Sequence, residues 1–298
     1  MPKKIILSLL IVLQLSLLST PLSAKTLKIM TWNLEWLSSH GVAQFPASER
    51  RASDVQILAR YFAANKPDIL AFQEVNDLKA IKSIVGSNYR IFLSDRAKPD
   101  NKKHQFSDIN QFTGFAIREG IKVTDKPDIK LDRNKRSKLR LASYLLLNEK
   151  GHRPIHLLSV HLKAGCTGKY HSNHSCKVLK KEAKHLNHWI AKRQRSHDRY
   201  IILGDFNHQL VHKKDWLWKI ISKNISPQPQ RLTLHTKSRC LVRSKRHPNK
   251  TYHYYSMIDH IIASPDIQAS EASQQLFLKP DVLRYQLSDH CPLTANIQ

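Results

Sequence analysis

The 298-residue sequence contains few glycines, few prolines and no long flexible stretch. Eight glycines and 13 prolines are too few for a collagen-like chain or a linker. No segment repeats at intervals of 20–50 residues, which argues against a solenoid. Hydrophobic residues make up 41% of the chain, as in ordinary globular proteins, so wholesale disorder is also excluded. We therefore expect one folded domain, over residues 25–298.

Acidic residues are also scarce. The 23 Asp and Glu residues are outnumbered by 49 Lys and Arg residues, which gives a formal net charge of +26. Such a surface attracts polyanions, including nucleic acid, anionic lipid, lipopolysaccharide and heparin-like glycans. The charge therefore predicts the electrical character of the partner, but not the reaction.

The longest apolar run, residues 5–18, is too short for a transmembrane helix, which needs about 20 residues. The run follows Lys3 and Lys4 and precedes a small residue, Ala24, in the pattern of a cleaved secretory signal peptide. No cysteine stands directly after the run, so a lipoprotein anchor is not expected. We predict a signal peptide over residues 1–24 and a secreted or periplasmic protein without a stable membrane anchor. Cleavage would remove two lysines and no acidic residue, which leaves a charge of +24.

Four cysteines follow this segment, and in an oxidising compartment an even number favours disulfides. Cys166 and Cys176 are close in sequence and flank a polar loop, so we expect them to be bridged. The alternative is a zinc site, for which His171 and His174 would complete the ligands. Cys240 and Cys291 could form a second bridge, or either could be a buried free thiol.

Hydrophobic periodicity divides the chain into helices and strands. Residues 48–65, 76–85 and 175–195 have the apolar spacing of helices. Strand patterns occupy residues 27–33, 68–75, 112–117, 139–147, 154–161, 200–203, 258–263 and 293–297. Several strands follow one another without an intervening helix, so we expect an α/β fold with a mixed sheet or with two packed sheets and helices outside.

Basic residues are concentrated in three places. Residues 133–140 and 237–250 are basic and are expected to be irregular, the second being followed by Tyr252, Tyr254 and Tyr255. A third set lies along one face of the predicted helix 175–195, at i, i+3, i+4 and i+7: Lys177, Lys180, Lys181 and Lys184. Like charges packed in this way repel one another, which is understandable if an anion lies beside them. We call these four residues the lysine stripe.

Polar side chains occur at the ends of the apolar strands, where ligand sites of α/β folds gather. They are Asn33, Glu74, His161, Asp205, Asn207, Asp259, Asp289 and His290. Each alone has an ordinary structural explanation, such as a turn cap, a helix start or a core histidine. Together, acids that converged at one edge would repel one another unless a divalent cation lay between them. The oxygen donors of Glu74, Asp289, Asn33 and Asp205 suit Mg²⁺, Mn²⁺ or Ca²⁺ rather than zinc.

Six short motifs follow one another in a recognisable order: Trp32-Asn33, Gln73-Glu74, a strand ending in His161, Gly204-Asp205-Phe206-Asn207, Ile258-Asp259-His260 and Ser288-Asp289-His290. This order resembles the endonuclease/exonuclease/phosphatase superfamily, and the resemblance covers residues 27–297. It implies the deoxyribonuclease I-like fold, a four-layer α/β sandwich of two mixed sheets packed face to face with helices outside.

The resemblance also implies roles for individual residues. Glu74, with the amide of Asn33 beside it and Asp289 nearby, corresponds to the metal site, with Mg²⁺ as the expected ion. Asp205 and Asn207 correspond to the pair that orients the attacking water and holds a phosphoryl oxygen.

The histidines and one arginine complete the implied site. His290 corresponds to the general base or phosphate stabiliser, Asp259 to the acid that orients it, and His161 to a second active-site histidine. Arg140 corresponds to an arginine before a central strand. These roles agree with the chemistry, because phosphodiester hydrolysis builds negative charge that a cation and nearby donors stabilise.

The superfamily hydrolyses several kinds of phosphate ester, so the fold alone does not choose the substrate. Its phosphatase branch has Cys-Asp-Arg where this chain reads Ile258-Asp259-His260. A sphingomyelinase-like enzyme would need exposed aromatics, for which Tyr254 and Tyr255, or Trp216 and Trp218, are candidates. Neutral choline headgroups give no reason for the large positive charge, whereas a polynucleotide does.

The sequence therefore predicts a monomeric, metal-dependent nuclease, most simply a DNA endonuclease of low sequence specificity, with DNA favoured over RNA. The alternatives are a secreted phospholipid phosphodiesterase and, third, a cationic binding protein that has lost turnover.

Overall fold

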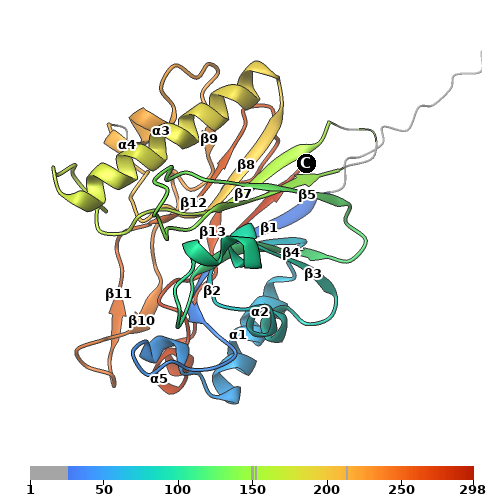
Figure 1. Cartoon of the computed structure of the whole chain (residues 1–298). Coiled ribbons are helices and arrows are strands. Elements are labelled where there is room, and N and C mark those ends of the chain that lie inside the picture. Colours follow the sequence, from blue (N-terminus) through green and yellow to red (C-terminus); the bar gives the residue numbers. More distant parts are fainter. Residues whose placement is uncertain (1–25, 149–150, 152, 213) are drawn as a thin grey trace, which may run out of the picture.

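The computed structural model describes residues 26–148, 151, 153–212 and 214–298. The predicted signal peptide, residues 1–24, lies outside these ranges. Two six-stranded sheets pack face to face and carry helices on their outer surfaces (Figure 1), which is the four-layer sandwich that the resemblance implied. Within the described part of the chain, no helix is both long and apolar enough to cross a membrane.

The first sheet has the strand order β13-β14-β1-β2-β4-β3. Its strands are β1 (Leu27–Leu37), β2 (Ile69–Val75), β3 (Tyr89–Leu93), β4 (Phe112–Arg118), β13 (Ser273–Gln274) and β14 (Leu293–Ile297). Its outer face is covered by α1 (Ala52–Asn65), α2 (Leu78–Val85) and α5 (Lys279–Arg284).

The second sheet has the order β5-β6-β7-β8-β12-β9. Its strands are β5 (Val123–Ile129), β6 (Ala142–Leu147), β7 (Ile155–His161), β8 (Arg199–Asp205), β9 (Gln230–Arg231) and β12 (Asp259–Ala263). The helices α3 (His174–Arg195) and α4 (Trp216–Ile221) cover its outer face. A separate hairpin, β10 (Leu241–Arg243) and β11 (Thr251–His253), projects from the body (Figure 1).

The central strands are buried on both faces. In β1, Ile29 packs between the two sheets and the next residue, Met30, packs under the helices. In β7, Leu157 packs between the two sheets and Leu158 packs under the helices. Such strands read as continuous apolar runs rather than as an alternation of apolar and polar residues. This explains why every central strand could be recognised from the sequence.

Each sheet contains one parallel pair at its centre, β1 with β2 and β7 with β8. Parallel strands end at the same edge, so the pairs bring Asn33 opposite Gln73 and His161 opposite Asp205. The antiparallel strand β12 then sets Asp259 opposite Asp205. Polar residues from both sheets are thereby gathered at one edge of the sandwich.

Three sequence expectations need correction. Residues 237–250 are not wholly irregular, because β10 lies among them and pairs with β11. The strands β3 and β5 were not predicted; both are edge strands whose side chains are mostly half-buried or exposed. The helix expected from residue 48 begins at Ala52, where Asp54 accepts a 2.8 Å hydrogen bond from the backbone N–H of Arg51.

Candidate active site

The strand ends turn into the site through unusual backbone conformations. Of the described residues, seven non-glycine residues have a positive φ, and four of these are Glu35, Trp36, Glu74 and Asn207. Each such conformation costs about 1–3 kcal/mol and persists where the surroundings impose it. Gly204 has a φ of 147°, and a Cβ atom there would collide with the Val160 carbonyl, so only glycine allows β8 to lie this close to β7 just before Asp205.

Two carboxylates from the two sheets meet around one amide. The Nδ2 of Asn33 donates to Glu74 Oε1 and to Asp205 Oδ2, both at 3.1 Å. Asp205 also accepts from the backbone N–H of Asn207 at 2.7 Å and from its Nδ2 at 3.1 Å. Asn33 therefore bridges the carboxylates as a donor, while its own oxygen accepts from the N–H of Glu35 at 2.9 Å.

His161 closes this group. Its Nε2 lies 3.5 Å from Glu74 Oε1 and 3.4 Å from Asp205 Oδ2. Burial, followed by the positive charges of Arg140 and His290, holds the pKa of His161 well below its usual range, so the ring is neutral. Its Nδ1 is buried without a hydrogen-bond partner among the described atoms.

The electrostatics of this group fit a divalent cation. Burial is the largest cause of a raised pKa of Asp205, which stands at about 7. His290 opposes the rise, and the charges of Asp259 and Glu74 add to it. Ligand atoms of Glu74, His161 and Asp205 all lie within 4.8 Å of one another. A cation between them would remove the cost of bringing these carboxylates together.

A second histidine–carboxylate pair lies alongside. His290 Nδ1 donates to Asp259 Oδ2 at 2.7 Å, and its Nε2 lies 4.0 Å from Asp205 Oδ2. Burial lowers the pKa of His290, but Asp259, Asp205 and Asp289 outweigh it, and the pKa stands well above its usual range. His290 is thus positioned as a charged donor whose orientation is fixed by Asp259.

The remaining predicted residues are placed as follows. Asp289 Oδ1 is 3.8 Å from His290 Nε2. In the described ranges two groups of side chains could hold a metal ion, one being Glu74, His161 and Asp205 and the other Asp205, Asp259 and His290. Asp289 is in neither group, although the sequence assigned it to the metal. Arg140 lines the cavity and donates to the Leu162 carbonyl at 2.7 Å. The lysine stripe lies on the first turns of α3, and none of its four residues is among those that line the cavity.

The carboxylates and histidines described above, namely Glu74, His161, Asp205, Asp259 and His290, form the floor of a cavity of about 850 Å³. Residues that the sequence did not single out also line it, among them Glu35, Trp36, Phe45 and Ser238. Glu35 accepts from the backbone N–H of Asp289 at 2.9 Å. In the sequence, only the position of Glu35 two residues after Asn33 could have indicated that it belongs to the site.

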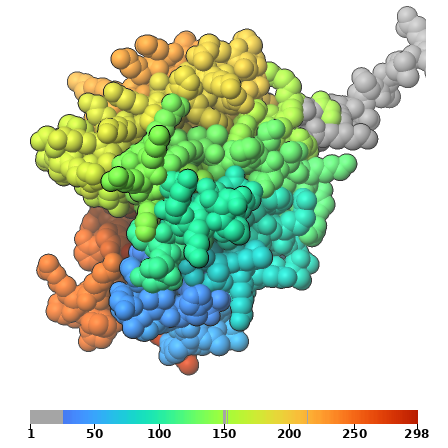
Figure 2. All heavy atoms as spheres, viewed as in Figure 1, coloured from blue at the N-terminus to red at the C-terminus, as the bar shows by residue number. Residues whose placement is uncertain are grey.

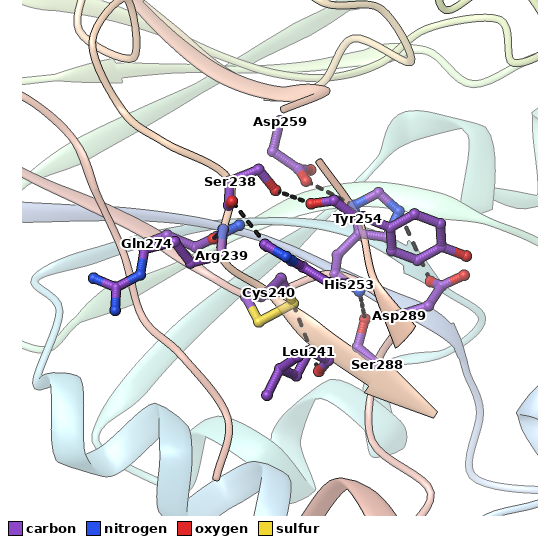
Figure 3. Close-up of a disulfide and its surroundings, with 12 residues drawn as sticks. Ser238, Arg239, Cys240, Leu241, His253, Tyr254, Asp259, Gln274, Ser288 and Asp289 are labelled. Atoms are coloured by element: carbon purple, nitrogen blue, oxygen red, sulfur yellow. Dashed lines mark hydrogen bonds and ion pairs between the residues drawn. A yellow bond between two sulfur atoms is a disulfide. The ribbon is translucent and has the colours of Figure 1, made fainter. Parts of the chain in front are cut away.

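The hairpin supplies part of the wall. Lys245 and Tyr254 line the cavity, and Lys245 Nζ is 3.6 Å from Asp289 Oδ2. A disulfide joins Cys240, at the base of the hairpin, to Cys291, the residue after His290 (Figure 3). The hairpin is therefore covalently attached next to a predicted catalytic residue.

The second disulfide joins Cys166 to Cys176, with their Cα atoms 5.1 Å apart. This is the pair that the sequence favoured, and it leaves neither sulfur as a thiolate for the alternative zinc site. The bond closes the loop between β7 and α3. Disulfides are typical of proteins outside the reducing cytosol.

The fold and the grouping of acids and histidines at facing strand ends define a deoxyribonuclease I-like α/β sandwich. The chain belongs to the endonuclease/exonuclease/phosphatase family, whose sequence profile matches residues 30–290. Members of this family are typically metal-dependent hydrolases of phosphodiesters or other phosphate esters.

Solved structures share the fold at low sequence identity. A family protein from Bacteroides vulgatus is 13% identical with a TM-score of 0.66, covering 92% of this chain and 99% of its own. TDP2 from Caenorhabditis elegans is 14% identical with a TM-score of 0.61, covering 91% and 75%. A mannosyl-6-phosphatase from Bacteroides thetaiotaomicron is 14% identical with a TM-score of 0.60, covering 91% and 99%. No curated protein matches the sequence.

Proposed function

We propose that this protein is a metal-dependent nuclease that acts outside the cytoplasm as a monomer and cleaves DNA in preference to RNA with little sequence specificity. The observation that carries the proposal is an acidic cavity floor whose lining also includes the basic side chains of Arg140 and Lys245. Lys245 reaches into the cavity, and the hairpin and the first turns of α3 lie on the same side of the molecule (Figure 2). Basic side chains that contact phosphates hold any sequence alike.

Glu74 holds the metal in this proposal, with the amide of Asn33 beside it and Asp289 as a further carboxylate of the same cavity. Mg²⁺ is the expected ion, with Mn²⁺ or Ca²⁺ as substitutes. The bound cation would offset the negative charge that develops on the phosphoryl oxygens. The neutral His161 and the carboxylate of Asp205, both beside Glu74, lie close enough to join the ligand set.

The protein's own groups would then divide the proton transfers. Asp205 accepts the proton of the attacking water, while Asn207 keeps that carboxylate oriented through two hydrogen bonds. His290, held by Asp259, donates through Nε2 to a phosphoryl oxygen or to the leaving oxygen. Arg140 adds a half-buried positive charge to the same cavity. Such acid–base assistance typically contributes ~10²–10⁴ in rate.

The inactive-binder alternative is disfavoured, because every proposed catalytic side chain is present and mutually oriented. A phospholipid phosphodiesterase remains the second candidate, and one observation favours it: Tyr255 is 81% exposed near the cavity mouth, as a membrane-inserting residue would be.

The test is to incubate purified protein with plasmid DNA, RNA and sphingomyelin liposomes, each with Mg²⁺ and with EDTA. We expect nicking and fragmentation of the plasmid that EDTA abolishes, slower loss of RNA and intact liposomes. Liposome hydrolysis with undamaged plasmid would replace the proposal with the lipid alternative.

A further inference from the structure

We propose that Tyr252 and Tyr254 form a stacking site for unpaired nucleobases at the edge of the catalytic cavity. We call this pair the tyrosine platform. The inference rests on the proposed nuclease activity and adds the form of the substrate, which is a single strand or an unpaired segment rather than a closed duplex.

The platform leads from the cavity to the solvent. Tyr254 lines the cavity together with His290 and Asp289, and Figure 3 shows its ring next to Asp289. The ring of Tyr252 lies 5.0 Å from that of Tyr254, at 76° to it. Tyr254 is 37% exposed and Tyr252 is 51% exposed, so aromatic surface is open to a ligand along this path.

The charge around the platform indicates what it binds. Lys245, Arg246 and Lys250 are all exposed in the loop of the same hairpin. Aromatic rings flanked by cationic side chains are the usual means of holding single-stranded nucleic acid, because the rings stack on bases and the cations contact the backbone. Bases inside a closed duplex stack on one another and leave no face for a tyrosine.

The platform is held firmly in place. The Cys240–Cys291 disulfide fixes the base of the hairpin. The guanidinium of Arg243 donates to the carbonyls of Val282 at 3.1 Å, Leu283 at 2.8 Å and Tyr285 at 3.1 Å. A site that is already ordered loses little entropy when the ligand binds. Because the tether reaches the residue after His290, a base on the platform would have a fixed place relative to the reacting phosphate.

The test measures binding separately from cleavage. Fluorescence anisotropy in EDTA is recorded for a labelled 12-nucleotide single strand and for its blunt duplex. The variants are Tyr252→Ala, Tyr252→Phe and, as a matched exposed tyrosine outside the platform, Tyr255→Ala. Each stacked ring is worth a factor of about 5 to 150 in affinity, so Tyr252→Ala should weaken single-strand binding by at least about fivefold.

Duplex affinity of Tyr252→Ala should change by less than about twofold, because the ring has no exposed base face to contact. Tyr252→Phe keeps the ring and should retain binding, and Tyr255→Ala should bind both ligands as the wild type does. Equal losses on single strand and duplex, or a Phe variant as weak as the Ala variant, would overturn the platform.

The two levels of the proposal can fail separately. If the wild type cleaves DNA but Tyr252→Ala binds single strands normally, the platform is wrong and the nuclease stands. If the wild type neither binds nor cleaves oligonucleotides, both are wrong. Loss of liposome binding in Tyr255→Ala would then assign the hairpin to a lipid surface.

Discussion

The floor and the rim of the cavity are built on opposite principles. The floor comprises Glu74, His161, Asp205, Asp259 and His290, and all except His290 lie in or at the ends of core strands. Asn33 bridges Glu74 and Asp205 by two hydrogen bonds of 3.1 Å, and His290 donates to Asp259 at 2.7 Å. The rim comprises the hairpin and residues 133–140, of which Lys245 and Arg140 line the cavity, and the lysine stripe, which does not; all three are basic and mostly exposed. A disulfide and cation-to-carbonyl contacts hold the hairpin of this rim, since it has no core of its own.

This difference indicates that the floor and the rim have separate roles, the floor in catalysis and the rim in substrate binding. A buried, densely bonded floor can hold reacting atoms within tenths of an ångström, whereas an exposed rim can only attract and position a large substrate. Mutations in the floor should therefore change turnover, and mutations in the rim should change affinity and its dependence on salt.

The largest effect is expected from the floor. Glu74→Gln removes the proposed metal carboxylate and His290→Ala removes the proposed acid–base group, so each should lower kcat by ~10²–10⁴ or more while the melting temperature shows a folded protein. Glu119→Gln and His188→Ala, which change exposed residues of the same types, serve as matched controls and should retain activity. Wild-type turnover in a folded Glu74→Gln or His290→Ala variant would contradict the assignment.

The floor was also the part that could be predicted from the sequence. Apolar runs such as residues 69–72 and 201–203 identify strands buried on both faces, and the polar residue after each run identifies the edge of the sheet. Glu35 was not predicted as a site residue. No sequence pattern around it shows that its carboxylate will accept a hydrogen bond from the backbone N–H of Asp289.

The rim could not be predicted in the same way. The strands β10 and β11 are three residues long, and they are placed by a bond between residues 51 positions apart, Cys240 and Cys291. Four cysteines allow three pairings, and sequence alone favoured only the short one. The lysine stripe was predicted correctly as one helical face, but its distance from the cavity depends on how α3 packs.

Removing the Cys240–Cys291 disulfide should lower both stability and catalysis, because this bond connects the hairpin of the rim to the floor. Replacing Cys240 and Cys291 by serine opens a loop of 51 residues and should cost ~4 kcal/mol of unfolding free energy in the chain-entropy model, against ~3 kcal/mol for Cys166 and Cys176 with their loop of 10. Only the first pair should also impair catalysis, because it frees the residue after His290. Urea unfolding and kcat/KM check both statements. Equal kinetic damage from the two double variants would mean that the hairpin and the floor are not coupled.

The stabilisation of the protein by Mg²⁺ should depend on pH, because the carboxylate of Asp205 is buried in the floor. The pKa of Asp205 is raised from 3.8 to about 7 in the folded protein. Between these values the folded state keeps a proton that the unfolded chain loses, so this group lowers the free energy of unfolding progressively as the pH rises, and the full penalty is present above pH 7. A bound cation offsets that penalty. Mg²⁺ should therefore raise the melting temperature more at pH 8 than at pH 5.

At a Mg²⁺ concentration 100-fold above Kd, the stabilisation is about 2.7 kcal/mol. Scanning fluorimetry with Mg²⁺ and with EDTA measures it. The Asp205→Asn variant carries no titratable group at this position, so its Mg²⁺ response should be smaller and less dependent on pH. An equal melting shift at both pH values in the wild type would place the cation away from Asp205.

The smallest effect is expected where the rim is farthest from the chemistry. Lys180→Glu with Lys184→Glu reverses two charges of the lysine stripe, whose members otherwise repel one another along α3. DNA binding should weaken with salt along a log–log line with a slope of about −0.9 for each phosphate neutralised, and the double variant should flatten this slope by about 0.9 for each phosphate that it no longer neutralises. KM should rise alike for all sequences, whereas kcat at saturating DNA should stay nearly unchanged, because these residues do not touch the reacting phosphate.

The control is Lys79→Glu with Lys82→Glu, which makes the same change in net charge on α2, a helix on the outer face of the other sheet (Figure 1). If the two double variants flatten the slope equally, the positive charge acts through the net field of the molecule, and the lysine stripe is not a docking surface.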